Sequence, residues 1–522
     1  MRLLKIFAVG RAFLHPKSTV YKEKNMKRIL CFIFAMLMLL PLVSCGGAGG
    51  NVTDDSTAIT DGASADDTTE PAETGFVDNY DGVFQVGYSR IDITPETPIP
   101  LNTGDLLTGV KERLFATCVA INDGKNTALI FSLDVKNIGA EHDKAMKYRI
   151  KMATKVPEKN IMLNAMHNHS APTICTPADD PVVKKWTAKV YSLVVKAAQE
   201  AIEDLADAEM YMGTAKTTNV AFVRRYIHED GSFSSIHYRG ASTTPIVAHE
   251  SEADDTAQIV RMVRADKKDV LITNWQAHVA HAVSNIGYIV SADYVHYIRS
   301  DIEAADDDVL VAFYCGASGN INETVKIPEL SVAHGNYKRV GQAVAKAIIG
   351  QLDNLERIQE GQIITDVDIY TATYREVDAE RVEQAKEVIA SGEKNSAPYT
   401  ALLDKYGFKS SYEVDRVKSL GGLQKKTYDL TLGAISVGDL AFVSVPYEMF
   451  DTNGMEVKDG SPFKMTFILS MTGDCAGYVP SALAVKNGGY EVYQSLFKYG
   501  TAEEAVAVFL EMLNKQYDKR NK

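Results

Sequence analysis

Two histidines in a His-x-His pattern are the first residues of the chain whose types and spacing could do chemistry. His167 and His169 directly follow the apolar run KNIMLNAM at 159–166, which is typical of a β-strand. In extended backbone, residues i and i+2 point to the same side, so both imidazoles can converge on one point. Histidine is the commonest metal ligand, and two of them make half of a zinc site. The alternative is a pair of hydrogen-bonded surface histidines.

A further histidine and a carboxylate end two other strand-like runs. His278 follows the apolar start of LITNWQAHVAHA, with His281 close by, and the chain has only 11 histidines. Glu448 closes the run 439–445 in the sequence Pro-Tyr-Glu. Because a scaffold usually presents its site where its elements end, Glu448 is a candidate for a third protein ligand. The alternative for Glu448 is an exposed residue at a sheet edge. We expect the imidazoles to face solvent in a cleft.

The elements that must position these side chains alternate between strand and helix. Residues 114–134 predict two strands around a turn at Asp123-Gly124. Further strands are predicted at 208–214, 269–275, 309–315, 428–435, 439–446 and 463–469. Apolar spacing predicts helices at 141–155, 181–206, 293–305, 334–354, 376–391 and 501–517. This alternation predicts an α/β (mixed α+β) fold, and the Glu- and Lys-rich stretch 376–420 predicts an insertion or a solvated layer.

Composition and missing motifs exclude several classes of function. The chain has 522 residues, of which 46% are hydrophobic, and a formal net charge of −13. A surface that binds phosphates needs an excess of basic residues, so we expect no nucleic-acid partner. The sequence contains no convincing Walker loop, strand-linked GxGxxG, HExxH or CxxC pair. The commonest nucleotide, dinucleotide, zincin and zinc-ribbon sites are therefore excluded.

The first 82 residues predict targeting and a tether. Residues 27–44 (KRILCFIFAMLMLLPLVS) place basic residues before a short apolar run, which is typical of a secretory signal peptide. Its end, Leu-Val-Ser before Cys45, resembles the bacterial lipobox and predicts Cys45 as a lipidation site at the cell surface or the periplasm-facing membrane. Residues 46–75 hold seven carboxylates and no basic residue, which predicts disorder. The predicted boundaries are 1–25 upstream read-through, 26–44 lipoprotein signal peptide, 45–82 disordered acidic tether and 83–522 folded domain.

Four cysteines lie beyond the predicted tether: Cys118, Cys175, Cys315 and Cys475. An extracellular compartment permits disulfides, but the spacing of the four cysteines does not give their pairing.

Ordered motifs along the predicted domain carry a family resemblance. FQVGYSRIDITP at 84–95, RLFATCVAINDGKNTALIFSLD at 113–134 and NIMLNAMHNHSAP at 160–172 come first. They are followed by VRRY at 223–226, NWQAHVAH at 274–281, VAFYCGASGNIN at 311–322, VPYEMF at 445–450, GYVPS at 477–481 and GGYE at 488–491. In this order the motifs resemble the neutral/alkaline (non-lysosomal) ceramidase superfamily over roughly 84–522, as a divergent member. The resemblance implies a large single catalytic body of mixed sheets with flanking helices, and the chain stops without the family's C-terminal immunoglobulin-like domain.

The resemblance also implies a zinc site and its neighbours. Carried over motif by motif, the implied zinc ligands are His167, His278, Glu448 and Tyr478. His169 is implied to act on the water or the substrate. Arg224, with Arg225 as the adjacent alternative, and Tyr490 are implied to complete the pocket.

One position departs from the family pattern. The family has Gly-Asp-x-Ser-Pro-Asn in its glycine-rich loop, with a serine implicated in catalysis, whereas this chain has Asn322 at the place of that serine. An amide cannot serve as a nucleophile, but it can donate a hydrogen bond to an oxyanion. Asn322 therefore weakens the expectation of ceramide cleavage more than the expectation of zinc-dependent hydrolysis.

The function implied by these features is that of a cell-surface, zinc-dependent hydrolase of an amide bond. The expected substrate is an N-acyl lipid or a related amide, and the expected cofactor is Zn²⁺. The alternative is a surface lipoprotein that binds a ligand or a partner and has lost catalysis, because solute-binding lipoproteins share such a signal and tether. Bound zinc distinguishes the two.

Overall fold

A computed structural model describes residues 82–520, apart from 102, 176–179, 238, 240 and 323–335. The described residues all belong to the compact unit Phe76–Lys522. The predictions for 1–81, including lipidation of Cys45, lie outside the described residues. Among the helices that the structure describes, none has the length and apolar content needed to cross a membrane.

The larger sheet is mixed and has the strand order β14-β13-β12-β7-β1-β4-β5-β6, with β16 paired to β7. β5 and β6 run parallel at one edge, β13 and β14 run parallel at the other, and the pairs between them are antiparallel. The strands are β1 Gln85–Asp92, β4 Phe115–Asn122, β5 Thr127–Leu133, β6 Ile161–Ala165, β7 Ala206–Lys216, β12 Thr256–Arg264, β13 Asp269–Trp275, β14 Val309–Cys315 and β16 Glu356–Arg357. β13 is buried along its whole length, which explains its almost continuous apolar sequence.

A second sheet packs face to face on the first. Its order is β17-β18-β19-β21, and β19 and β21 run parallel. The strands are β17 Ile363–Thr373, β18 Thr427–Val437, β19 Leu440–Val445 and β21 Met465–Ser470. One apolar core joins the facing surfaces, with Val86 and Ile272 from the larger sheet and Phe442 and Phe467 from the second.

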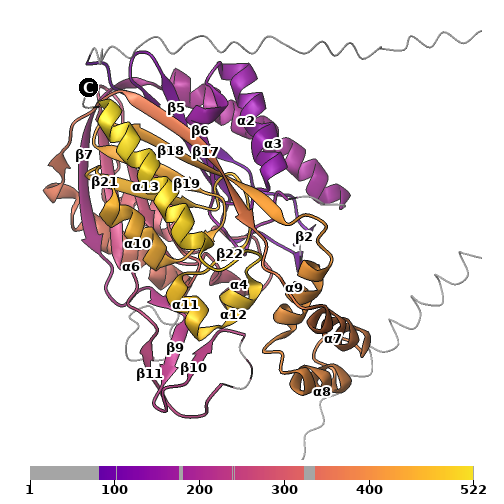
Figure 1. Cartoon of the computed structure of the whole chain (residues 1–522). Coiled ribbons are helices and arrows are strands. Elements are labelled where there is room, and N and C mark those ends of the chain that lie inside the picture. The colour runs from indigo at the N-terminus through magenta and orange to yellow at the C-terminus, as the bar shows by residue number, and fades with distance from the viewer. Residues whose placement is uncertain are drawn as a thin grey trace, which may run out of the picture. The chain divides into compact units, whose positions relative to one another are not determined.

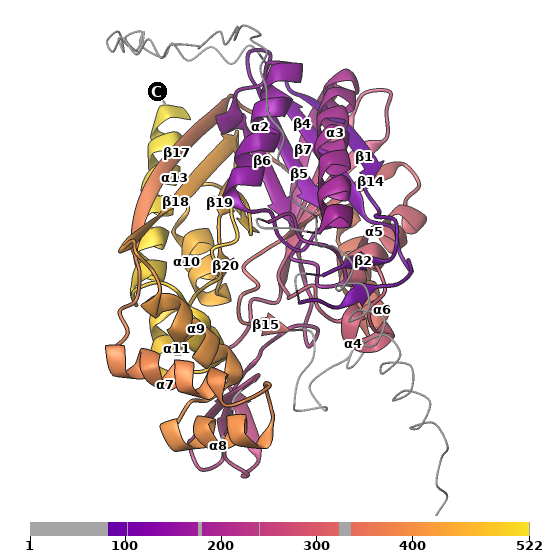
Figure 2. The ribbon, with the colours of Figure 1, turned by 90° about the vertical axis from the view of Figure 1, so that its right-hand side faces the viewer.

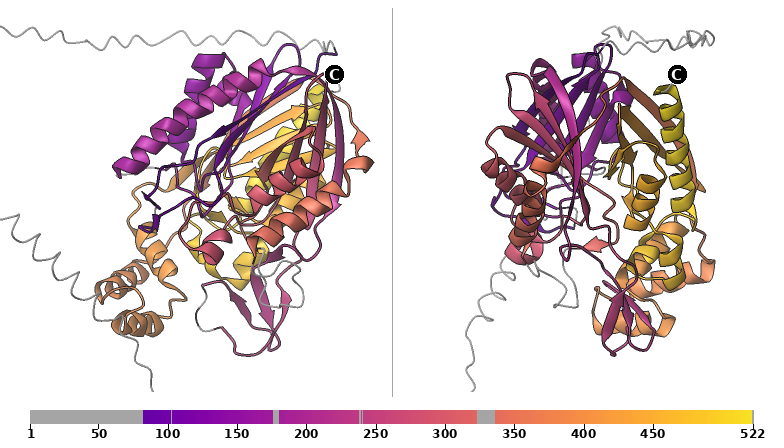
Figure 3. Two further views of the ribbon diagram at one scale, coloured as in Figure 1. Left: turned by 180° about the vertical axis from the view of Figure 1, so that it is seen from behind. Right: turned by 90° about the vertical axis from the view of Figure 1, so that its left-hand side faces the viewer.

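Helices cover the outer face of each sheet (Figures 2 and 3). The larger sheet is covered by α2 Ala140–Thr154, α3 Pro181–Glu203, α5 Asp293–Ala305 and α6 Tyr337–Ile349. The second sheet is covered by α10 Asp451–Gly460 and α13 Thr501–Arg520. The body therefore has four layers, helix, sheet, sheet and helix, which confirms the predicted mixed α/β class with flanking helices. The described residues end on α13, and no immunoglobulin-like domain occurs among them.

Helix α3 shows how the local sequence sets these elements. The side chain of Asp180 accepts hydrogen bonds from the backbone amides of Val182 and Val183, and Pro181 occupies the first turn, where its missing amide costs nothing. Along the helix the apolar positions recur at helical spacing, so Trp186 and Val190 face the core while polar residues face outward.

The stretch predicted as an insertion or a solvated layer is a compact helical insertion between β17 and β18. It contains α7 Ala379–Ala390, α8 Ala397–Tyr406 and α9 Ser411–Gly421, at the lower right of Figure 1. These helices pack around a small apolar core of their own that includes Val382, Leu403 and Val414.

Figure 1 labels several shorter elements at the lower end of the two sheets. The short elements are β2 Ile99–Pro100, β3 Leu106–Leu107, β8 Phe222–Val223, β9 Arg225–His228, β10 Phe233–Ser235, β11 Ile246–His249, β15 Ile321–Asn322, β20 Glu448–Met449, β22 Tyr478–Val479, α4 Ala282–Ile286, α11 Ala482–Asn487 and α12 Tyr490–Gln494. They carry most of the side chains that the family resemblance singled out.

Candidate metal centre

Three strands end where the predicted ligands begin. β6 of the larger sheet leads into His167, β13 of the same sheet leads into His278, and β19 of the second sheet leads into Glu448. Each of these strands runs parallel to a neighbour. The carboxyl ends of both sheets therefore bring together side chains that lie up to 281 residues apart in the sequence, 448 − 167 = 281.

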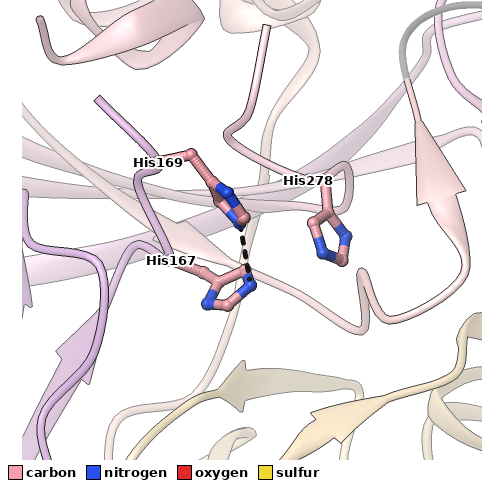
Figure 4. Close-up of side chains that lie close together, drawn as sticks. All are labelled: His167, His169 and His278. Atoms are coloured by element: carbon pink, nitrogen blue, oxygen red, sulfur yellow. Dashed lines mark hydrogen bonds between the residues drawn. The ribbon is translucent and has the colours of Figure 1, made fainter. Parts of the chain in front are cut away.

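The side chains of these residues converge within hydrogen-bonding range. Glu448 Oε2 lies 3.3 Å from His167 Nε2 and 3.2 Å from His278 Nε2. His169 Nε2 lies 3.2 Å from His167 Nε2, and the ring nitrogens that the three histidines offer all lie within 4.8 Å of one another. Figure 4 shows the three imidazoles directed toward one another.

The cluster is buried, which corrects two expectations. His167 is 4% exposed and His278 is 1% exposed, so these two imidazoles do not face solvent as expected, whereas His169 is partly exposed. Glu448 is buried as well, so its alternative assignment as an exposed edge residue is wrong. Segments that are distant in the sequence cover these side chains. The local sequence therefore does not indicate that they are buried.

The two histidines of the His-x-His pattern meet by a different route from the one expected. His167 has a φ of +56°, in the left-handed region that residues other than glycine rarely adopt. The chain therefore turns at His167 instead of continuing extended, and the turn brings the ring of His169 back toward that of His167. Unusual backbone conformations of this kind cluster at functional sites.

Both proposed imidazole ligands have their other ring nitrogen tied to an oxygen. Nδ1 of His167 lies 2.9 Å from the side-chain oxygen of Asn137, and Nδ1 of His278 lies 2.6 Å from the backbone carbonyl of Ser318. An oxygen of this kind can only accept, so Nδ1 carries a proton in both rings and Nε2 is the nitrogen left to bind a metal. Both Nε2 atoms face Glu448 Oε2, a buried atom that accepts no hydrogen bond. Acceptors facing one another across about 3 Å suit a cation between them.

The protonation states agree with a cluster of acceptors. Burial, helped by the nearby charge of Arg224, lowers the pKa of His278 to about 4. Burial also lowers the pKa of His169 well below its ordinary value, and His167 and Lys136 act in the same direction. Burial raises the pKa of Glu448, and His167 and His278 lower that pKa below its ordinary value only when their rings are protonated. At neutral pH, His278 and His169 are therefore neutral.

Tyr478 joins the cluster from the strand beside Glu448. β22 pairs in parallel with β20, which sets Tyr478 opposite Glu448. The Tyr478 hydroxyl lies 3.4 Å from His278 Nε2 and accepts a hydrogen bond of 3.0 Å from Arg224 Nη2. Burial, followed by the charge of Glu448, raises the pKa of Tyr478 well above its ordinary value. The phenol is therefore neutral in this arrangement.

The two neighbouring arginines take different directions. Arg224 reaches Tyr478, and its Nη1 donates to the side-chain oxygen of Asn322 at 3.2 Å. Arg225 turns the other way and donates to Glu250 and to the carbonyls of Ala484 and Gly488. The geometry therefore places Arg224, and not Arg225, beside the cluster.

Tyr490 and Asn322 lie around the rim of this group. The ring of Tyr490 lies 5.7 Å from that of Tyr478 and 5.3 Å from that of Tyr412 on the helical insertion. Asn322, on β15, is linked to the cluster through Arg224. Because the side-chain oxygen of Asn322 already accepts from Arg224, the NH₂ group of its amide is the part that can donate a hydrogen bond to a substrate.

Some residues at the site escaped the sequence analysis. Glu491 is fully buried and binds both Arg224 and Arg225. It was not singled out, although it belongs to the GGYE motif beside Tyr490. Asn137 follows β5, and nothing in its surroundings marked it as the residue that orients His167. His281, noted for its proximity in sequence, stands at the start of α4 and is not among the three clustered histidines.

The residue types present fit a metal ion. Two imidazoles, a carboxylate and a phenol are ligands that zinc accepts, and the carboxylate oxygen lacks any other partner. His169 lies beside the same point, as a fifth group that can bind metal or move a proton.

Comparisons with known proteins bear on the fold. No protein-family model matches this chain, and no curated protein matches it. Among solved structures, it is similar to a neutral ceramidase from Pseudomonas aeruginosa, with a TM-score of 0.62 and 15% identity over 83% of this chain and 74% of the other. It is also similar to a ceramidase complexed with C2, with a TM-score of 0.61 and 15% identity over 84% of this chain and 76% of the other. The chain therefore has the fold seen in neutral ceramidases.

Proposed function

We propose that this chain is a zinc-dependent hydrolase of an amide bond and a divergent member of the neutral ceramidase-like superfamily. Its substrate is an N-acyl lipid or a related amide. The fold shared with neutral ceramidases supports the reaction class. The buried cluster of His167, His278 and Glu448 supports the metal.

One observation carries the proposal. Glu448 Oε2 is buried, accepts no hydrogen bond, and faces the Nε2 atoms of His167 and His278 at 3.3 and 3.2 Å. A buried carboxylate without a partner is costly, so a cation at this point resolves the arrangement.

The residues around the cluster supply the remaining functions. A zinc ion held by His167, His278, Glu448 and Tyr478 would lower the pKa of a bound water and polarise the scissile carbonyl. His169 is neutral, so it accepts a proton from the attacking water and returns it to the leaving nitrogen.

Charge on the reacting oxygen is stabilised from the other side of the cluster. Arg224 is held in place by Glu491 and is directed at Tyr478, so its guanidinium faces the point where an oxyanion develops. Tyr490 adds a phenol near the same point, and the amide of Asn322 adds a donor where the family has a hydroxyl.

The proposal extends to location. Cys45 is lipidated and anchors the domain at a bacterial cell surface or a periplasm-facing membrane, on the support of the lipobox-like sequence before it. This brings the site close to lipid substrates.

Hydrolysis assays on metal-stripped protein test the function. A chelator should abolish release of fatty acid from N-acyl lipids and of acid from short amides, and added zinc should restore it. Glu448→Gln should remove the zinc-restored activity, whereas the exposed Glu383→Gln should keep it. Protein that binds zinc stoichiometrically but hydrolyses no amide or ester would favour the alternative, a ligand-binding lipoprotein without catalysis.

A further inference from the structure

Two cysteines from distant parts of the chain lie in contact beside the site. The Sγ atoms of Cys175 and Cys475 are 3.1 Å apart, although the residues are 300 positions apart in the sequence. Both side chains are partly exposed. The other cysteines that the structure describes, Cys118 and Cys315, are each buried within the larger sheet.

Cys175 ends a segment that supports His167. Ile174 donates to the carbonyl of Asn137 at 2.7 Å and accepts from the amide of Gly139 at 2.8 Å, so this segment and residues 137–139 are bonded side by side. Asn137 in turn holds Nδ1 of His167. Gly139 lies against Cys175: a Cβ atom added to Gly139 would lie 3.6 Å from the sulfur of Cys175.

Cys475 begins a segment that supports the other half of the cluster. The amide of Ala476 donates to the carbonyl of Pro446 at 3.0 Å, and the amide of Glu448 donates to the carbonyl of Gly477 at 2.9 Å. The same segment continues into β22 and Tyr478. The contact between the two sulfurs therefore lies between the supports of His167 and the supports of Glu448 and Tyr478.

We propose that Cys175 and Cys475 form a disulfide that joins these two supports. The bond ties the segment that orients His167 to the segment that carries Glu448 and Tyr478, and so fixes the spacing of the candidate ligands. The proposal does not depend on the proposed hydrolase activity, because the bond is detected by mass and by thiol reactivity alone.

The reaction requires an oxidant, for which a small-molecule disulfide such as oxidised glutathione suffices. The Cys175 thiolate attacks one sulfur of that disulfide, forms a mixed disulfide and releases one thiol. Cys475 then loses its proton and attacks Cys175 Sγ, which forms the protein disulfide and releases the second thiol. The two cysteines lose two protons and two electrons. The small-molecule disulfide takes up these protons and electrons and becomes two thiols.

The surroundings favour Cys175 as the first attacking group. A hydrogen bond from Cys475 lowers the pKa of the Cys175 thiol, against the effect of burial. The same contact and burial raise the pKa of Cys475. Compartments outside the cytosol permit such bonds to persist, which agrees with the predicted signal peptide.

Peptide mapping of the purified full chain tests the bond. After treatment with oxidised glutathione, blocking of free thiols and digestion, a linked peptide pair containing Cys175 and Cys475 should be found, about 2 Da lighter than the sum of the two thiol peptides. Adding dithiothreitol should lower the melting temperature by roughly 5 °C or more, because the bond closes a long loop.

Variants separate this disulfide from other thiol effects. The double variant Cys175→Ser/Cys475→Ser should lose the dithiothreitol-dependent shift in melting temperature, and Cys118→Ala should keep it. Full alkylation of both cysteines in the oxidised native protein would overturn the proposal. A stable glutathione adduct on Cys175 without the linked peptides would overturn it as well.

Discussion

Glu491 binds Arg224 in a fully buried ion pair, with 2.8 Å between Arg224 Nε and Glu491 Oε1. The second oxygen of Glu491 accepts a hydrogen bond from Arg225 Nη1 at 3.0 Å. One carboxylate thus pairs with two buried guanidinium groups, of which Arg225 also pairs with Glu250, and it fixes the orientation of the one that faces Tyr478. Glu491 therefore holds Arg224 in position at the candidate site without being one of the proposed metal ligands.

Glu491→Gln should destabilise the protein by about 3–5 kcal/mol, because breaking a buried ion pair leaves charge without compensation. Urea denaturation measures this loss of unfolding free energy. The control is Glu383→Gln, which removes an exposed pair with Lys386 and should cost no more than about 1 kcal/mol. Equal effects of the two substitutions would show that Glu491 does not hold the arginines.

His169→Ala should retain the bound metal but reduce amide hydrolysis by roughly 10²–10⁴-fold, the usual contribution of a general acid/base. The reason is that the proposed ligands His167, His278, Glu448 and Tyr478 all remain in the variant, although His169 Nε2 lies 3.2 Å from His167 Nε2. Metal analysis and turnover should be measured on the same preparation. Loss of metal together with activity would make His169 a ligand instead.

The wild-type protein should hydrolyse ceramide poorly, because Asn322 stands where the family has a serine. Asn322→Ser should raise ceramide turnover if the pocket still accepts that substrate, and it also releases Arg224 Nη1 from the amide oxygen. Asn322→Ala is the matched control, since it releases Arg224 without adding a hydroxyl. Robust ceramide cleavage by the wild type would refute the idea that Asn322 excludes this substrate.

Asp451 should make stability depend on pH. Burial raises the pKa of Asp451 to about 6, although Asn320 donates to its carboxyl oxygen at 2.6 Å and acts in the opposite direction. Because the folded state binds this proton more tightly than the unfolded state does, the stabilisation is complete below the unfolded pKa and is lost as pH rises through about 6.

Comparison with Asp451→Asn isolates this contribution, because an amide does not titrate. The unfolding free energy of the wild type relative to the variant should fall by up to about 3 kcal/mol between about pH 4 and about pH 7. Urea denaturation at both pH values measures the difference. A constant difference would mean that Asp451 titrates alike in the folded and unfolded states.

The sequence was sufficient to predict that the candidate ligands follow strands, but not which distant residues bury and orient them. His167, His278 and Glu448 each follow an apolar run bounded by polar residues, so their place at strand ends was predictable. The bounds of α5, β13 and β14 were predicted as the structure has them, because the two strands are nearly continuous apolar runs and the apolar residues of α5 recur at helical spacing.

Other features depend on distant contacts or on weak local patterns. The pairing of Glu491 with Arg224 joins residues 267 positions apart, and the burial of His278 comes from the Ser318 loop and Tyr478. β17 was missed because its sequence IITDVDIYTAT carries acidic residues and lies at a sheet edge. The predicted helix 334–354 ends early, at Ile349, where Gly350 caps α6.

Metal analysis of the purified protein and three variants tests the central claim most directly. The wild type should contain about one zinc per chain, and His167→Ala and His278→Ala should each lose most of it, because each removes an Nε2 ligand that faces Glu448. His296→Ala, which alters a histidine on α5 outside the cluster, should keep the metal. Circular dichroism should confirm that each variant is folded. Stoichiometric zinc in folded His167→Ala and His278→Ala, or no metal in the wild type, would contradict the account.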